Sequence, residues 1–336
     1  MPDGSDLADR RGPFDGLSPD TVLEAVESSF DFRLDGSMQA FNSYINRVYG
    51  LRDEDGQRLV AKFYRPGRWS ARALRDEQDF VAELANAEIP VAAPLTARNG
   101  ETLSRSLLDS TPVYFALYPL KGGRSFDPVD GEDWFRIGSL IGRLHSVGAN
   151  TRASQRINLD PALVTAGQIG ELEEEALMPP DEAAEFSKIC SKALSRIDED
   201  FQALKEAAPA LRIHGDLHRG NILERPGEGL MLIDFDDMAN GPAVQDIWML
   251  LPGSIADSGA ELAALLEGYE NFRAFDRRSL ALVEDLRFMR MIHFIHWCAR
   301  QRHDARFETS FPDWGSKGFW IKEIEDLRDQ LKRLGN

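Results

Sequence analysis

The stretch IHGDLHRGNIL, residues 213–223, places a group of polar and charged side chains between apolar residues. His214, Asp216 and His218 stand at alternate positions in it. Alternate side chains of an extended chain point to the same side, and histidine and aspartate are common metal ligands. From these residues alone, the stretch is either a metal site formed by the three side chains or a loop that performs phosphoryl transfer.

The residues after this stretch favour phosphoryl transfer. Asn221 lies five positions after Asp216, and Asp234 ends the apolar run LMLID, residues 230–234. Phosphoryl transfer needs a carboxylate that accepts or positions the proton of the attacking hydroxyl, and oxygen ligands that hold Mg²⁺ against the nucleotide phosphates. The pattern H-x-D-x-x-x-x-N, followed by a strand that ends in aspartate, supplies both kinds of group.

A lysine and a glutamate upstream add a matching pair. In RLVAKFYR, residues 58–65, strand alternation directs Lys62 to the face opposite Phe63, toward a cleft or the core. Glu77 lies fifteen positions later, on the helix face that it shares with Leu74 and Val81. A lysine on a strand and a glutamate on a helix form an ion pair in kinases, where the pair presents the lysine to the α- and β-phosphates of ATP.

The usual glycine-rich phosphate loop is missing. The segment FNSYINRVYG, residues 41–50, stands where a G-x-G-x-x-G motif is expected. Ser43 and Asn46 could bind phosphate there through hydroxyl, amide and backbone N–H groups, or could simply form a turn.

Composition narrows the class of protein. The chain has 336 residues, with 56 acidic and 39 basic side chains and a net charge of −17. This charge argues against non-specific binding to nucleic acid or to anionic membranes. No apolar run approaches the roughly 18 residues of a spanning helix, so we expect the protein to be cytoplasmic. We also expect a monomer. Cys190 and Cys298 are far apart and are expected to be buried, inert thiols.

The hydrophobic pattern predicts an α+β fold of two lobes. Residues 1–13 are read as a flexible tail, residues 14–120 as a small β-rich lobe that binds nucleotide, and residues 121–336 as a larger helical lobe with the catalytic loop, the metal site and the substrate site. The cleft between the lobes is the expected ligand site.

Local patterns give the expected elements. In the first lobe these are a helix capped by Ser18, strands at 42–51 and 58–65 joined by a turn at Asp55-Gly56, a helix at 70–87, and strands IPVAAPL (89–95) and PVYFALYPL (112–120). In the second lobe they are helices near 132–147, 168–178, 181–206, 258–272, 278–303 and 317–334, with short strands at 211–217 and 230–235.

Taken together, these motifs resemble a known family. The segments that carry the resemblance are FNSYINRVYG, VAKFYRPGRW, IPVAAPL, HGDLHRGNIL, LIDFDD and NGPAVQDIWMLL. They are similar to the bacterial stress response kinase A family, within the larger group of aminoglycoside phosphotransferase and choline-kinase-like enzymes. The resemblance spans residues 14–330. It implies a bilobal protein-kinase-like fold and the ATP-dependent phosphorylation of protein serine or threonine.

The resemblance also implies roles for individual residues. Asp216 is then the proton acceptor, and Asn221 and Asp234 bind Mg²⁺. Lys62 and Ser43 contact ATP, and FALYPL, residues 115–120, is the adenine-binding hinge. Asp246 resembles an aspartate that braces the catalytic loop.

The sequence departs from the eukaryotic protein-kinase pattern in three places. Gly215 replaces the arginine before the catalytic aspartate, Phe235-Asp236 replaces Phe-Gly, and no A-P-E motif follows. An activation loop controlled by phosphorylation is therefore not expected.

Several alternatives stay open at this level. The same loop serves small-molecule kinases that phosphorylate an amino alcohol, a sugar or an aminoglycoside, and a metal-dependent hydrolase built on the two histidines is a weaker alternative. We expect His214 and His218 to support the loop rather than to react. Asp236 and Asp237 are either further metal contacts or parts of a polar loop. The segment MRMIHFIHWCAR, residues 289–300, is read as core packing in preference to a substrate wall.

Overall fold

The computed structural model describes residues 12–108, 111–304 and 307–334. Residues 1–11 of the predicted tail lie outside this range. Where the described chain begins, Phe14 is buried against the apolar side of the first sheet.

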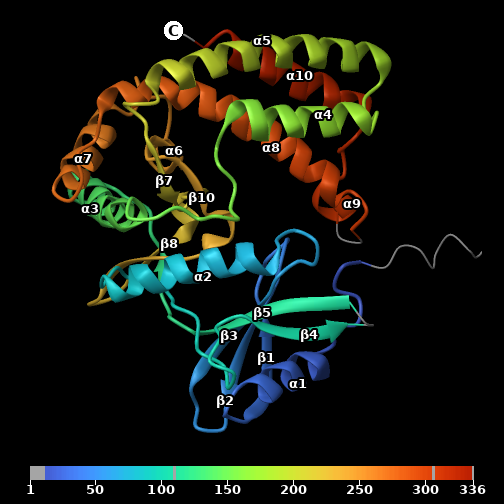
Figure 1. Cartoon of the computed structure of the whole chain (residues 1–336), viewed down its shortest axis with the longest axis vertical. Coiled ribbons are helices and arrows are strands. Elements are labelled where there is room, and N and C mark those ends of the chain that lie inside the picture. The colour runs from blue at the N-terminus through green and yellow to red at the C-terminus, as the bar shows by residue number, and fades with distance from the viewer. Residues whose placement is uncertain (1–11, 109–110, 305–306, 335–336) are drawn as a thin grey trace, which may run out of the picture.

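The first third of the chain forms an antiparallel sheet with two helices (Figure 1). The five strands are ordered β1-β2-β3-β5-β4. The elements are α1 (Pro19–Ser29), β1 (Leu34–Ala40), β2 (Arg47–Asp53), β3 (Arg58–Phe63), α2 (Ala71–Asn86), β4 (Ser104–Leu108) and β5 (Thr111–Pro119). The predicted cap of α1 is confirmed, because the hydroxyl of Ser18 accepts a hydrogen bond from the Thr21 N–H.

The two faces of β3 have different roles. Ala61 and Phe63 point into an apolar core that the sheet shares with α1, and Phe63 stacks on Phe115 of β5. Lys62 points to the opposite face, where it lines a large cavity. Strand alternation therefore assigned the side of the sheet that faces the cavity correctly.

The rest of the chain is mainly helical. Its helices are α3 (Gly131–Gly148), α4 (Ala166–Glu174), α5 (Pro180–Leu204), α6 (Val244–Trp248), α7 (Gly259–Glu270), α8 (Val283–Gln301), α9 (Phe307–Ser310) and α10 (Lys317–Leu331). Figure 1 shows these helices on one side of α2 and the five-stranded sheet on the other. The predicted order, a small β-rich part followed by a larger helical part, is confirmed. The division at residue 120 stays a prediction.

Short strands within the helical part position the two loops of interest. These strands are β6 (Arg124–Ser125), β7 (Ala210–Ile213), β8 (Ile222–Arg225), β9 (Gly229–Leu232) and β10 (Ala239–Pro242). Because β7 pairs with β10 and β8 pairs with β9, the β7–β8 loop and the β9–β10 loop lie side by side. The N–H of Ile233 donates to the carbonyl of Asn221 at 3.1 Å and ties the two loops together.

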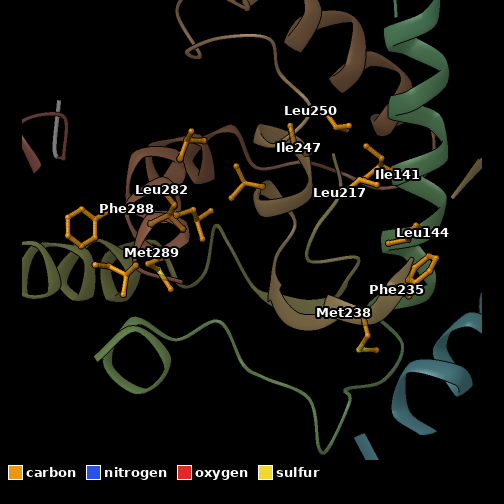
Figure 2. Packing of buried hydrophobic residues seen from close by; sticks show 14 of the residues in the cluster. Ile141, Leu144, Leu217, Phe235, Met238, Ile247, Leu250, Leu282, Phe288 and Met289 are labelled. Carbon is orange, nitrogen blue, oxygen red and sulfur yellow. The ribbon is translucent and has the colours of Figure 1, made fainter. Parts of the chain in front are cut away.

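A large apolar core packs against both loops. Leu217 of the first loop and Phe235 and Met238 of the second are buried in it, together with Ile141 and Leu144 of α3 (Figure 2). Burial of such side chains is the main stabilising contribution in a fold of this kind. The polar residues of the loops are thus held on a rigid apolar base.

Three sequence predictions about elements were wrong or incomplete. IPVAAPL (89–95) is not a strand; Val91 makes a single bridge to Leu232, and Pro90 and Pro94 lack the N–H donors that a strand ladder needs. The predicted strand at 42–51 is irregular up to Asn46. The predicted helix at 278–303 begins as a 3₁₀ turn, Arg277–Leu282, before α8. Strands β1 and β4 were not predicted.

Two further expectations concern residue environment. Cys190 and Cys298 are unpaired and buried, and burial raises the pKa of both thiols. Within the described ranges, no helix combines the length and the apolar character that crossing a membrane requires.

Candidate active site

A cavity of about 790 Å³ collects most of the predicted site residues. Ser43, Lys62, Glu77, Asp216 and Asp234 all line it. Lys62 and Asp234 are 172 positions apart in the chain, yet their side chains are in contact. The cavity thus lies where the five-stranded sheet meets the two loops of the helical part.

Lys62 is held by carboxylates on several sides. Its Nζ lies 3.0 Å from Asp234 Oδ1, 3.6 Å from Asp236 Oδ1 and 3.8 Å from Glu77 Oε1. Burial opposes a charge on Lys62, but these carboxylates prevail and raise its pKa well above the ordinary value. The lysine is therefore a fixed positive charge, and its pair with Glu77 is present as the longest of three contacts.

Glu77 has a stronger partner that the sequence did not indicate. Arg156 Nη2 donates to Glu77 Oε2 at 2.6 Å, and both side chains are buried. Arg156 also donates to the carbonyls of Ala73 and Asp236, at 2.8 and 2.7 Å. Burial raises the pKa of Glu77, while Lys62 and Arg156 act against the rise. Arg156 thereby joins helix α2 to the β9–β10 loop.

The loop that carries Asp216 depends on a glycine. Gly215 has φ +86°, and a Cβ at this position would lie 2.1 Å from the carbonyl oxygen of Asp237. Any other residue at 215 would push the two loops apart and would also be strained. This explains why glycine stands before Asp216.

Asp246 fixes the backbone of the same loop. Its carboxylate accepts hydrogen bonds from the N–H groups of His214 at 2.7 Å and Gly215 at 2.9 Å. His145 Nε2 lies 3.0 Å from the same carboxylate, and His145, His214 and Asp246 are buried. These contacts agree with the bracing role expected for Asp246.

The two histidines of the loop point to different places. His214 Nε2 donates to the carbonyl of Ile233 at 2.9 Å, and its ring packs on Phe235. His218 Nδ1 accepts from the Gly220 N–H at 3.0 Å. Within the described part of the chain, no group of three or more His, Cys, Asp or Glu side chains is arranged to hold a metal ion. The structure therefore does not support the hydrolase alternative, and the histidines support the loop.

Asp234 and Asn221 offer oxygen atoms that suit Mg²⁺. Asp234 has φ +62°, a conformation that aspartate tolerates, and its side chain is 55% exposed. Lys62 holds the pKa of Asp234 below its usual range, which keeps it ionised. Asn221 Nδ2 donates to the carbonyl of Asp216 at 2.9 Å, so its Oδ1 is the atom left to act as a ligand. Asp236 Oδ1, which lies 3.6 Å from Lys62 Nζ, is buried and has no hydrogen-bond partner among the described residues. This donor set fits a hard cation that takes its remaining ligands from phosphate and water.

Arg68 binds the two aspartates whose role the sequence left open. Its Nη1 lies 2.9 Å from Asp236 Oδ2, and its Nη2 lies 2.5 Å from Asp237 Oδ1. Burial works against ionisation of Asp237, but Arg68 outweighs it and holds the pKa of Asp237 well below its usual range. Both carboxylates are thus engaged in a buried polar loop.

Helix α8 was predicted as core packing, which is correct for one face only. Ile292, Ile295 and Cys298 are buried in the helical part. The other face lines the cavity with Arg290, His293, Phe294 and Trp297. Arg290 Nη2 donates to Asp216 Oδ1 at 2.6 Å. This contact could not be predicted from the sequence, because the partners are 74 positions apart and α8 carries other arginines.

The segment in place of the glycine-rich loop packs against α8 and against Phe311, the residue after α9. The ring of Tyr44 lies 5.3 Å from that of Trp297 and 6.0 Å from that of Phe311, measured between centroids. Nearby, Arg65 forms two hydrogen bonds of 2.7 Å to Asp304. These contacts close one side of the cavity.

Asn46 and Ser43 of this segment differ in role. Both line the cavity, but Asn46 is buried, and its Oδ1 accepts from the Arg65 N–H at 3.1 Å, which ties this segment to the residues that follow β3. Ser43 lines the cavity, where its hydroxyl is available to a ligand.

Comparison with known proteins defines the class. A sequence model of the phosphotransferase enzyme family matches residues 37–283. This range covers both loops and Lys62, while the part of the cavity wall formed by Arg290, His293, Phe294, Trp297 and Phe311 lies beyond it. The chain belongs to the phosphotransferase enzyme family.

Curated relatives are more specific. The chain is 37% identical over 323 residues to stress response kinase A of Escherichia coli (strain K12), which covers 96% of this chain and 94% of that protein. It is 37% identical over 330 residues to the serine/threonine protein kinase RdoA of Salmonella typhimurium (strain LT2), with 98% and 97% covered. The predicted resemblance to stress response kinase A is thereby confirmed.

Solved structures share the fold at lower identity. Amicoumacin kinase hAmiN, in complex with AMP-PNP, Ca²⁺ and Ami, superposes with a TM-score of 0.69 at 20% identity, over 96% of both chains. The microcompartment-associated aminopropanol kinase gives 0.68 at 17% identity, over 93% of this chain and 95% of that one. The predicted bilobal kinase-like α+β fold is confirmed.

Proposed function

We propose that this protein transfers the γ-phosphoryl group of ATP to the hydroxyl of a serine or threonine in a protein acceptor, with Mg²⁺ as the metal. The observation that carries the proposal is the meeting of Lys62, Asp216 and Asp234 in one cavity of about 790 Å³. The relatives named as stress response kinase A and serine/threonine kinase support the choice of a protein acceptor.

Each residue has a task in this proposal. Lys62 contacts the α- and β-phosphates, and Glu77 helps to hold Lys62 in place. Asn221 and Asp234 provide oxygen ligands for Mg²⁺, which would neutralise phosphate charge. Ser43 contacts the phosphates, and residues 115–120 bind the adenine. The division between the two lobes falls near residue 120.

Asp216 acts on the acceptor. It accepts a hydrogen bond from the acceptor hydroxyl, directs the oxygen at the γ-phosphorus and receives the proton as the bond forms. In the structure Arg290 Nη2 donates to Asp216 Oδ1 at 2.6 Å, and His218 Nε2 lies 3.7 Å from Asp216 Oδ2. Most of the rate enhancement then comes from positioning and from charge neutralisation.

A small-molecule alcohol is the second candidate acceptor. Phe294 and Trp297 form an aromatic wall of the cavity near Arg290, and such a wall suits a compact ligand. The structural neighbours named as amicoumacin kinase and aminopropanol kinase act on small molecules, according to their names.

The test is transfer of label from γ-labelled ATP in the presence of Mg²⁺. The purified chain is incubated alone, with a generic basic protein, with a generic acidic protein, and with a panel of amino alcohols, sugars and aminoglycosides. Label on protein supports the first acceptor, and label on a small molecule supports the second. A chain that binds ATP and labels none of these acceptors contradicts the proposed function.

The remaining expectations stay predictions. These are that the protein is cytoplasmic, that it is a monomer, and that it binds neither nucleic acid nor membranes. Sedimentation at several protein concentrations tests the oligomeric state.

A further inference from the structure

Arg290 is the positive charge that lies against Asp216. Within the described ranges, the lysines and arginines that line the large cavity are Lys62, Arg68, Lys121 and Arg290. Lys62 is bound to Asp234, and Arg68 to Asp236 and Asp237. Arg290 alone among these contacts the residue proposed to receive the acceptor proton.

The arginine of the catalytic loop itself points elsewhere. Arg219 Nη1 donates to Asp127 at 2.8 Å, and its guanidinium lies over the ring of Trp134. His293, on the cavity face of α8 beside Arg290, is largely uncharged near neutral pH, because burial lowers its pKa to about 4. His218 Nε2 lies 3.7 Å from Asp216 Oδ2, so a histidine and an arginine adjoin the carboxylate. Among the lysines and arginines that line the cavity within the described ranges, Arg290 is the one beside Asp216.

Arg290 is held less firmly than Lys62 and Arg68. Its side chain is 36% exposed, against 11% for Lys62 and 16% for Arg68. Its guanidinium makes one hydrogen bond among the described residues, to Asp216 Oδ1 at 2.6 Å. A guanidinium has five N–H donors, so most of them are available to a ligand.

There is also space beside the guanidinium. A second cavity of about 70 Å³ is lined by Arg290, His293, Gly215 and Asp237. Arg290 borders both cavities, so unfilled space adjoins its side chain on both sides. The backbone of α8 carries it from a rigid support, which suits precise placement.

A positive charge at Arg290 would reduce the electrostatic repulsion between the phosphoryl group and Asp216. A phosphoryl group that moves toward an acceptor at Asp216 brings negative oxygens toward a carboxylate, and like charges at short range oppose the transfer. An arginine at this place opposes the repulsion, because its planar donors bind phosphate oxygens in pairs.

We propose that Arg290 is a catalytic residue that binds the phosphoryl group as it passes from ATP to the acceptor, and that its contact with Asp216 holds it ready for this step. The inference rests on the proposed function. In the step, the acceptor oxygen forms a bond to the γ-phosphorus and the bond from that phosphorus to the β,γ-bridging oxygen breaks. The electron pair of the broken bond stays on ADP, and the acceptor proton goes to Asp216. Arg290 donates N–H groups to the phosphoryl oxygens throughout.

The experiment compares Arg290→Met and Arg290→Lys with the control Arg300→Met. Arg300 lies on the same helix, is 59% exposed, pairs with Glu171 and does not line the cavity. Three quantities are measured for each protein: transfer of label to an acceptor, the slow hydrolysis of ATP with water as acceptor, and the affinity for Mg²⁺ and a non-hydrolysable ATP analogue.

The expected result is a loss of about 10²–10³-fold in both transfer and hydrolysis for Arg290→Met, which is the usual effect of removing one such donor. Analogue affinity stays near that of the wild type. Arg290→Lys keeps part of the activity, and Arg300→Met keeps all of it. A further variant, Arg290→Ala, is tested with added guanidinium ion at concentrations far below those that unfold the protein. The ion should restore ATP hydrolysis, which a purely structural role of Arg290 would not allow.

Other results would overturn the role. If transfer falls while hydrolysis is unchanged, Arg290 binds the acceptor and not the phosphoryl group. If both rates are unchanged in Arg290→Met and in Arg290→Lys, Arg290 is not catalytic. If the wild type binds no ATP and shows neither reaction, the proposed function itself fails, and this role fails with it.

Discussion

Asp234 and Asp216 each pair with a cation, and the two pairs are held in different ways. Lys62 reaches Asp234 from β3, is 11% exposed and has two further carboxylates within 4 Å. Arg290 reaches Asp216 from α8 and is 36% exposed. Within the described residues, the Arg290 guanidinium donates a hydrogen bond to this one carboxylate.

This difference distinguishes two electrostatic roles that a cation can have in the cavity. A cation enclosed by carboxylates keeps its charge and place, and so provides a fixed site for the phosphates of a bound nucleotide. A cation on one partly exposed carboxylate can transfer its hydrogen bonds to an incoming anion at low cost. If the proposed function holds, the nucleotide side of the cavity is the rigid one and the acceptor side is the adjustable one.

Removing the fixed cation gives the largest expected effect among the variants of this comparison. Lys62→Met leaves Asp234 and Asp236 without their shared partner and removes the contact to the phosphates. We expect kcat/KM for phosphotransfer to fall about 10³-fold, with weaker ATP binding. Steady-state kinetics and nucleotide titration measure both.

A matched control lies on the same strand. Arg58→Met changes an exposed residue of β3 that does not line the cavity, and it should behave as the wild type. The fixed-site interpretation is wrong if Lys62→Met binds ATP as tightly as Arg58→Met does.

Arg156 tests the support behind the fixed site. Arg156→Leu leaves Glu77 buried without its 2.6 Å partner. Removing one member of a buried ion pair costs about 3–5 kcal/mol in the free energy of unfolding. Denaturant unfolding should show this loss, and the double variant Arg156→Leu/Glu77→Gln should recover part of it. Equal stabilities of the single and double variants would mean that Glu77 is not left with a buried charge.

How much of this site the sequence could predict depends on separation along the chain. Asp216, Asn221 and Asp234 lie within one short segment whose spacing is itself informative, and strand alternation placed Lys62 on the cavity face. The metal interpretation of the histidines was plausible from their spacing, but the backbone turns His214 toward the Ile233 carbonyl.

The missed residues share one property. Arg290, Arg156 and Arg68 meet their acidic partners across 74, 79 and 169 positions. Arginine is common on surfaces, so nothing local marks these three as buried or functional. Strand β1 was missed because its residues are mostly exposed and include Gly36, which weakens the apolar alternation that predicts a strand.

The smallest expected effect is on the pH dependence of stability and involves His293, which lies on the cavity face of α8. Burial lowers the pKa of His293 in the folded chain to about 4, from an ordinary value of 6.5. Between these values the unfolded chain binds more protons than the folded one, so stability falls as the pH drops from 6.5 to 4. The amide of Gln168 donates to His293 Nδ1 at 3.0 Å, and protonation of that nitrogen would break the bond.

His293→Gln removes this contribution. Thermal unfolding at several pH values should show a smaller loss of Tm on acidification in the variant than in the wild type. The same pH dependence in both proteins would mean that His293 is protonated equally well in the folded chain.

The most direct test of the account compares the wild type with Asp216→Asn for transfer of the γ-phosphoryl of ATP in the presence of Mg²⁺. Asparagine keeps the shape of the side chain but cannot take up the acceptor proton. We predict that the wild type transfers label and that the variant does so about 10³-fold more slowly, with unchanged ATP affinity. Transfer by Asp216→Asn at the wild-type rate would contradict the account.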